Sequence, residues 1–155
     1  MLNIIKASDK HLDELFELHV KYMTYHKKVD PYFNFTLDAS KEWKAHIKKL
    51  LNDKCKVVFV ALKEDVIIGF IDAGITKKAP IYEIQNVGSI GAIFVLPEHR
   101  RKGVAKALAE EVFKWLKSKD IEHVEHPISA KNNASLQTWK SLGFEEYMIW
   151  VKRNI

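Results

Sequence analysis

The stretch that decides the fold is IFVLPEHRRKGVAKALAEEVFKWL, which runs from Ile93 to Leu116. It begins with an apolar run that Pro97 ends. Three cations then precede a single glycine, Gly103, after which apolar residues recur at helical spacing. A helix that starts after such a turn presents free backbone N–H groups at its N-terminus, where the helix dipole adds partial positive charge. The stretch therefore predicts a strand–turn–helix unit with an anion site at the turn.

The residues of this turn suit a pyrophosphate. Gly103 lets the backbone approach a ligand closely because it has no Cβ, and Arg100, Arg101 and Lys102 add full positive charges. The spacing is too short for a P-loop, and the three glycines of the dinucleotide fingerprint are absent from it. A solvated basic turn is the alternative that these residues alone leave open.

The segments around this unit predict a single α/β domain over residues 1–155. Glu64-Asp65 suits a hairpin turn, which makes part of the sheet antiparallel, and the strand–helix–strand order around residues 90–128 implies a parallel crossover. We therefore expect a mixed, mostly antiparallel central sheet, with helices on both faces and segments 87–96 and 121–129 as its parallel pair. Strands are expected at 2–6, 56–62, 65–76, 87–96, 121–129 and 144–153, and helices after Ser8, Ser40, Gly103 and Asn132, the last ending at Gly143.

Composition limits the kinds of partner and compartment. The net charge of +5 favours anionic partners, but the lysines are scattered in pairs along the chain, so nucleic acid is an unlikely ligand. No apolar run approaches the roughly 20 residues that span a bilayer, so no membrane association is expected. The single cysteine, Cys55, forms no intrachain disulfide and favours a cytoplasmic setting. No Cys/His cluster is present, so we predict no metal site.

Two blocks of sequence resemble the GNAT superfamily of N-acyltransferases. Arg100-Arg101-Lys102-Gly103-Val104-Ala105 is similar to that family's acyl-CoA pyrophosphate loop, and the preceding IFVLPEHR looks like its fourth strand. The block NNASLQTWKSLGF (132–144) resembles the family's Asn-x-x-Ala-x-x-x-Tyr-x-x-x-Gly-Phe, with Ser135 where the family has Ala. The order of elements agrees as well, so the resemblance covers nearly the whole chain.

The resemblance implies acetyl transfer from acetyl-CoA to a primary amine by direct attack on the thioester. In the family the fourth and fifth strands splay apart, and the pantetheine arm lies between them. By this likeness the pantetheine and thioester pair with Ile93, Phe94 and Val95, and Asn132 either contacts the arm or caps the last helix. Ser135 is a further cofactor-binding residue by this likeness. The loop that holds the phosphates comprises Arg100, Arg101, Lys102, Gly103, Val104, Ala105 and Lys106.

The catalytic residues depart from the family pattern. Trp139 stands where many members have a tyrosine that protonates the leaving thiolate, and an indole N–H donates a hydrogen bond without transferring a proton. It either bonds the sulfur or packs on the sheet. The fourth strand lacks the usual carboxylate, which leaves Glu83, Glu125 and His126, or a base reached through water, as candidates.

The acceptor is an amine of a small molecule or of a protein. In the family the first helix and the loop after it form part of the acceptor wall, where Tyr32 and Phe33 are the candidates for substrate contact. Dimers are common in the family, so a homodimer is a further expectation. The alternative to an enzyme is a protein on the same fold that senses acyl-CoA, or binds through its basic surface, without efficient transfer.

Overall fold

The computed structural model describes residues 1–36 and 40–155. In this part of the chain the sheet has the order β1-β2-β3-β4-β5. Its first three pairings are antiparallel and β4 pairs with β5 in parallel, which confirms the predicted mixed sheet. The strands are β1 (Leu2–Lys6), β2 (Lys56–Lys63), β3 (Val66–Lys77), β4 (Asn86–Val95) and β5 (Val124–Glu125), and the helices are α1 (Leu12–Val29), α2 (Ser40–Asn52), α3 (Val104–Lys117) and α4 (Asn133–Ser141).

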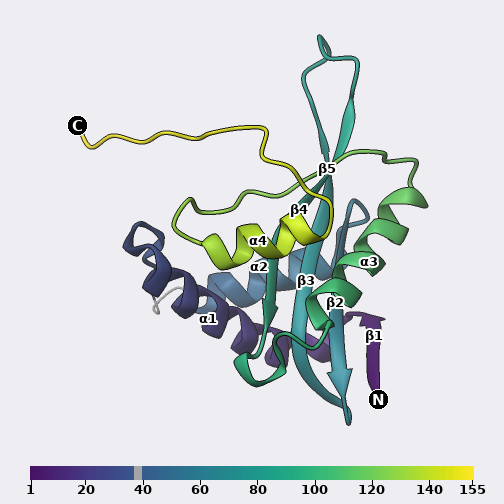
Figure 1. Ribbon diagram of the computed structural model, residues 1–155. Coiled ribbons are helices and arrows are strands. Elements are labelled where there is room, and N and C mark those ends of the chain that lie inside the picture. Colours follow the sequence, from purple (N-terminus) through teal and green to yellow (C-terminus); the bar gives the residue numbers. More distant parts are fainter. Residues whose placement is uncertain (37–39) are drawn as a thin grey trace.

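Helices cover both faces of the sheet, as predicted (Figure 1). On one face, Leu15 of α1 and Ile47 of α2 pack with Phe70 of β3. On the other, Leu108 of α3 and Trp139 of α4 belong to a separate apolar cluster. β4 contributes to both clusters because successive side chains of a strand point to opposite faces.

The predicted hairpin between β2 and β3 is confirmed. Glu64 and Asp65 are the two residues between the strands, and their φ values are 52° and 63°. Positive φ at both central residues matches the right-handed twist of paired strands, as in a type I′ turn. The β3–β4 connection differs, since it extends beyond the body of the molecule (Figure 1).

The predicted strand 121–129 is much shorter in the structure. Only Val124 and Glu125 pair with β4, opposite Gly88 and Ser89. At the next position the imidazole of His126, rather than a backbone group, reaches β4, and Pro127 has no N–H to donate. The two strands therefore separate after Ser89, and this separation is the splay that the resemblance implied.

The predicted strand at 144–153 is wrong. The segment after α4 is irregular, and it leads away from the sheet (Figure 1). Its sequence has the β-branched and aromatic composition of a strand, but a strand forms only where neighbouring backbone groups pair with it. Large apolar side chains consequently stay exposed here, with Ile149, Trp150 and Val151 at 89%, 87% and 91%.

Helix boundaries follow local signals. Ser8 precedes a short 3-10 turn (Asp9–His11), and α1 begins after it, at Leu12. Gly143 has a φ of 89° directly after α4, as expected of a glycine that ends a helix. Among the helices described, none is long and apolar enough to cross a membrane.

Candidate active site

The turn between β4 and α3 leaves the N-terminus of α3 open. It contains a 3-10 turn (Pro97–His99), and then Arg101 and Gly103 adopt positive φ values of 57° and 79°. Gly103 is the N-cap residue and supplies no side-chain hydrogen bond. A Cβ added to it would meet no protein atom within 4 Å, so the left-handed backbone rather than a lack of space favours glycine here. The first-turn N–H groups that an anion can reach belong to Val104, Ala105 and Lys106.

The three cations of the turn play different parts. The Nε of Arg100 donates to the carbonyl oxygen of Val95 at 2.9 Å, and its guanidinium lies 4.9 Å from the centre of the Tyr25 ring. Arg100 therefore fastens the turn to the end of β4. Arg101 and Lys102 are exposed, so their charges face solvent beside the N-terminus of α3. The result is a positively charged surface next to open backbone donors, as an anion site requires.

One edge of β4 is open beyond its short pairing with β5. In the described part of the chain the parallel ladder ends at Ser89. Ile93 to Val95 pair on their other side with Gly69 to Ile71 of β3. These three residues, predicted to hold the pantetheine, thus lie between the splay and the anion turn.

A cavity of about 320 Å³ lies against β4 on the face covered by α1 and α2. Its walls are mainly apolar and aromatic, and Asp72 of β3 supplies the carboxylate in the lining. At β4 the cavity is bounded by Gly91 and Ala92, next to the open edge. The other lining residues are His19, Tyr22, Met23, Trp43, His46, Ile47 and Leu50.

Asp72 is held at a β-bulge. Ile71 lies opposite Ile93 and Ala73 opposite Ile90, so Asp72 faces two residues of β4. One of the two, Ala92, donates its backbone N–H to Oδ2 of Asp72 at 3.0 Å. The other is Gly91, where a Cβ would lie 2.1 Å from Oδ1. The carboxylate thus fills the space that a side chain at position 91 would take.

The cavity shifts the pKa values of its titratable groups. Burial raises the pKa of Asp72 to about 6. Burial also raises the pKa of Tyr22 to about 12, and the Asp72 carboxylate adds to this shift. Burial lowers the pKa of His19 to about 4, and its Nδ1 lies 2.8 Å from the carbonyl oxygen of Leu15. At neutral pH the cavity therefore holds a carboxylate beside a neutral imidazole and a neutral phenol.

Two of the predicted base candidates lie away from this cavity. Glu83 is exposed in the β3–β4 connection, three residues before β4 begins. Glu125 forms an ion pair with Lys78, whose Nζ lies 2.5 Å from Oε1, and this hydrogen bond raises the pKa of Lys78. Neither carboxylate is among the residues that line the cavity.

His126 and Trp139 lie together on the opposite side of β4. Their ring centres are 4.7 Å apart, and Nδ1 of His126 lies 3.0 Å from the carbonyl oxygen of Ile90. Burial lowers the pKa of His126, which favours the neutral imidazole. Trp139 is only 1% exposed and belongs to the apolar cluster under α3. Trp139 thus packs in the core of this face, in agreement with one of its two readings, and a hydrogen bond from its indole N–H to the CoA sulfur stays a prediction.

Asn132 has the capping role that was one of its two alternatives. Its side-chain oxygen accepts the backbone N–H of Ser135 at 3.2 Å, at the start of α4. The segment that leads to this cap is tied to the end of α1, because Lys131 Nζ lies 3.2 Å from a carboxylate oxygen of Asp30. The splay is therefore bounded by a fixed connection between β5 and α4.

The proposed substrate contacts, Tyr32 and Phe33, lie at the surface. Their side chains are 64% and 41% exposed in the 3-10 turn after α1. Lys152 of the C-terminal segment lies over the Tyr32 ring, with Nζ 4.5 Å from its centre. Neither aromatic residue lines the cavity at Asp72, so they belong to an outer part of this face.

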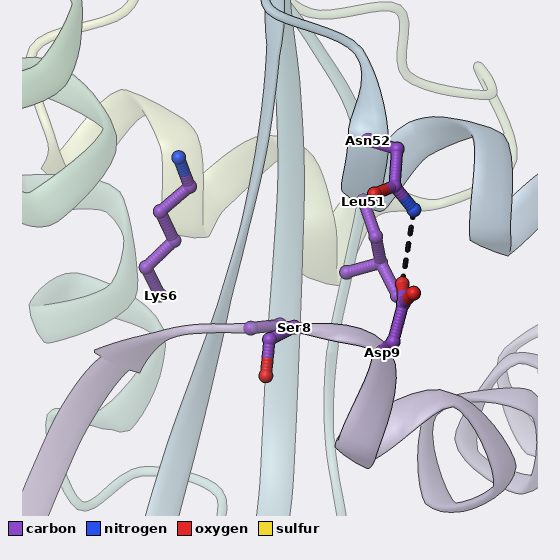
Figure 2. Close-up of a pocket in the computed structure, with 6 residues that line it drawn as sticks. Lys6, Ser8, Asp9, Leu51 and Asn52 are labelled. Atoms are coloured by element: carbon purple, nitrogen blue, oxygen red, sulfur yellow. Dashed lines mark hydrogen bonds between the residues drawn. The ribbon is translucent and has the colours of Figure 1, made fainter.

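A second hollow lies elsewhere, where the start of the chain meets the end of α2. Figure 2 shows Asp9 and Asn52 joined by their hydrogen bond, whereas the Lys6 side chain lies apart from them. The polar groups of this hollow do not converge on one point, so it is not a candidate catalytic site. Across residues 1–36 and 40–155, no three His, Cys, Asp or Glu side chains are grouped to hold a metal ion.

Asp72 was not identified from the sequence as a candidate site residue. It is the single charged residue inside the apolar run VIIGFIDAGIT of β3, and that is the signal that singles it out. Its relation to Gly91 depends on the register of two strands and on a bulge, which one sequence does not specify. The fourth strand does lack a carboxylate, as predicted, but its neighbour β3 places one beside it.

Comparison with known proteins finds acetyltransferases of similar sequence. An aminoglycoside N(6')-acetyltransferase type 1 from Salmonella typhimurium is 34% identical over 95 residues, a match that covers 57% of this chain and 61% of that enzyme's length. The enzyme of the same name from Acinetobacter haemolyticus is 27% identical over 146 residues, covering 94% of this chain and 92% of the relative.

Solved structures show the same fold. The aminoglycoside acetyltransferase AAC(6')-Iy, in complex with the bisubstrate analogue CoA-S-monomethyl-acetylneamine, is 26% identical and superposes with a TM-score of 0.76 over 100% of this chain and 99% of the other. The sequence profile of the acetyltransferase (GNAT) family matches residues 12–144. This confirms the predicted fold and supports the predicted class of activity, acetyl-CoA-dependent N-acetyl transfer. The chain belongs to the acetyltransferase (GNAT) family.

Proposed function

We propose that this protein transfers the acetyl group of acetyl-CoA to a primary amine of a small molecule. The observation that carries the proposal is the convergence of three features on β4. These are the open N-terminus of α3 at its end, the open edge at Ile93 to Val95, and the cavity with Asp72 on its face. An anion, an extended arm and an amine each have a complementary surface there.

The cosubstrate fits the first two features. The pyrophosphate lies at the N–H groups of Val104 to Lys106, and the pantetheine follows the open edge of β4 toward Gly91. Arg101 and Lys102 add electrostatic attraction, and Arg100 fixes the turn. Backbone N–H groups near Phe94 polarise the thioester carbonyl.

The relatives' names make aminoglycosides the first acceptors to test. The cavity offers one carboxylate among aromatic and apolar groups, which suits one ammonium at a time. Arylalkyl monoamines are therefore the informative contrast. A lysine peptide represents the protein amines that the sequence left open.

The test is thiol release from acetyl-CoA in the presence of each amine, with the acetylated product identified by mass spectrometry. We expect turnover with at least one small amine, well above the rate of acetyl-CoA hydrolysis without acceptor. Tight acetyl-CoA binding without acetylation of any amine would instead support the alternative, an acyl-CoA sensor on this fold.

We further infer that the protein acts in the cytoplasm as a homodimer. Cys55 is an exposed free thiol, which is compatible with a reducing compartment.

The C-terminal segment exposes contiguous apolar side chains from Tyr147 to Val151, a pattern typical of an interaction surface. A second copy presents the same segment, so reciprocal contacts close on themselves. Light scattering of the full chain and of a chain ending at Phe144 tests this, and a monomeric full chain would contradict it.

A further inference from the structure

The cavity at Asp72 combines a carboxylate with a mainly apolar and aromatic lining. Asp72 is partly exposed through the cavity, whereas Ala92 and Phe70 beside it are buried. In the described lining no arginine or lysine accompanies it. Lys56 of β2 acts on Asp72 electrostatically from outside the cavity lining. A carboxylate kept in such a place without a cation in the lining costs stability, so its presence favours a cationic ligand.

The Asp72 carboxylate lies next to the part of β4 that we assign to the thioester. Its Oδ2 is bonded to the N–H of Ala92, the residue before the stretch that we assign to the thioester. Its Oδ1 occupies the space left by Gly91. A bulge in β4 and a residue without a side chain therefore bring a β3 carboxylate to the open strand.

We propose that Asp72 binds the ammonium group of the acceptor and takes its proton before the amine attacks acetyl-CoA. This inference rests on the proposed function and adds to it the residue that activates the amine. Asp72 is thus the general base, a role for which the sequence left Glu83, Glu125, His126 or a base reached through water as candidates.

The step balances in protons and bonds. The carboxylate takes one proton from the ammonium, which leaves a neutral amine with a free electron pair. That nitrogen forms a bond to the thioester carbon, the carbon–sulfur bond breaks, and CoA leaves as a thiolate. The second proton shed by the nitrogen goes to the thiolate, and the carboxyl later returns its own proton to solvent.

The groups that face Asp72 are suited to this role. His19 and Tyr22 approach from α1, His46 from α2 and Lys56 from β2, while β4 contributes only Gly91 and Ala92. A pKa near 6 leaves Asp72 largely ionised at pH 7 and close to the range in which a general base is effective. The pKa shift supports the geometry and is not the basis of the proposal.

The experiment is the pH profile of kcat/KM with an aminoglycoside that bears a 6'-amino group. In the wild type kcat/KM should rise with pH, reach half its plateau near pH 6, and then level. Asp72→Asn keeps the shape and can still accept from Ala92, but it cannot take a proton. We expect about a 10²- to 10⁴-fold lower kcat/KM at pH 7. The remaining activity of the variant should increase as the pH rises toward the pKa of the amine, because only neutral amine then reacts.

Two further variants complete the test. Asp65→Asn makes the same substitution in the exposed β2–β3 turn, at a positive φ that Asn tolerates, and should match the wild type. Gly91→Ala places a Cβ against Oδ1 and should lower kcat/KM although the carboxylate is still present. Unchanged acetyl-CoA affinity by calorimetry shows that the variants are folded. An Asp72→Asn enzyme with the wild-type rate and profile would overturn the proposal.

Failure of the proposed function is a separate outcome, in which the wild type acetylates no amine. Binding of the same aminoglycoside to the CoA-saturated protein then decides the role of Asp72. At least tenfold weaker binding by Asp72→Asn supports an ammonium site. Equal affinities would overturn it.

Discussion

The two ends of the site are built in different ways. The anion end consists of neighbouring residues, Arg100 to Lys106, and uses the backbone of one turn and one helix start. The amine end is assembled from α1, α2, β3 and β4 around one carboxylate. A local site is visible in the sequence, whereas an assembled site depends on strand register. The two ends should accordingly respond to mutation in separable ways.

The largest effect should appear in stability at the amine end. The pKa of Asp72 rises from 3.8 to about 6 on folding, so the folded state holds its proton in a range where the unfolded state has lost it. This contribution makes unfolding easier as pH rises from about 4 to about 6. It amounts to about 3 kcal/mol at about 1.4 kcal/mol per pH unit.

Asp72→Asn should remove this contribution. Its free energy of unfolding, relative to the wild type, should increase by about 3 kcal/mol between pH 4 and pH 7. His19 acts in the opposite sense, since its pKa falls to about 4 and stability is lost as pH drops from 6.5 toward that value. Because both proteins contain His19, its contribution cancels when the free energy of unfolding of one is subtracted from that of the other. Urea titrations across this range check the prediction, and a constant difference would show that Asp72 is not desolvated.

The next effect should appear at the anion end. Gly103→Val adds a branched side chain where the pyrophosphate approaches and should weaken acetyl-CoA by about 2 kcal/mol, roughly thirtyfold. Valine is also strained at a φ of 79°, so Gly103→Asn serves as the matched variant that tolerates this backbone. Calorimetry should show weaker acetyl-CoA binding in both variants. An unchanged affinity in both would mean that the turn is only a basic surface.

The smallest effect should come from the exposed charges of the turn. Arg101→Gln or Lys102→Gln should each weaken acetyl-CoA by about 0.5–1.5 kcal/mol, and the loss should shrink at high salt because exposed charges are screened. Lys117→Gln, at the other end of α3, is the control and should change nothing. A loss that is independent of salt would point to a direct, desolvated contact instead.

The sequence predicted what depends on nearby residues. The hairpin at Glu64-Asp65, the helix start after Gly103 and the stop at Gly143 each follow from a few consecutive side chains, and all are found. The extent of the strand at 121–129 and the strand at 144–153 were wrong, because pairing is decided by a neighbour rather than by the segment itself. The role of Asp72 was not predicted for the same reason, since it depends on the residue of the neighbouring strand that lies opposite it.

The central claim is that one molecule spans both ends, with phosphates at α3 and an amine at Asp72. The affinity of a CoA–aminoglycoside conjugate tests it most directly, in the wild type, Gly103→Asn, Asp72→Asn and the double variant. We predict that the conjugate binds the wild type more tightly than CoA does. Each single variant should lose affinity, and the losses should add in the double variant because the two ends share no residue. A conjugate that binds no tighter than CoA, and is insensitive to Asp72→Asn, would contradict the account.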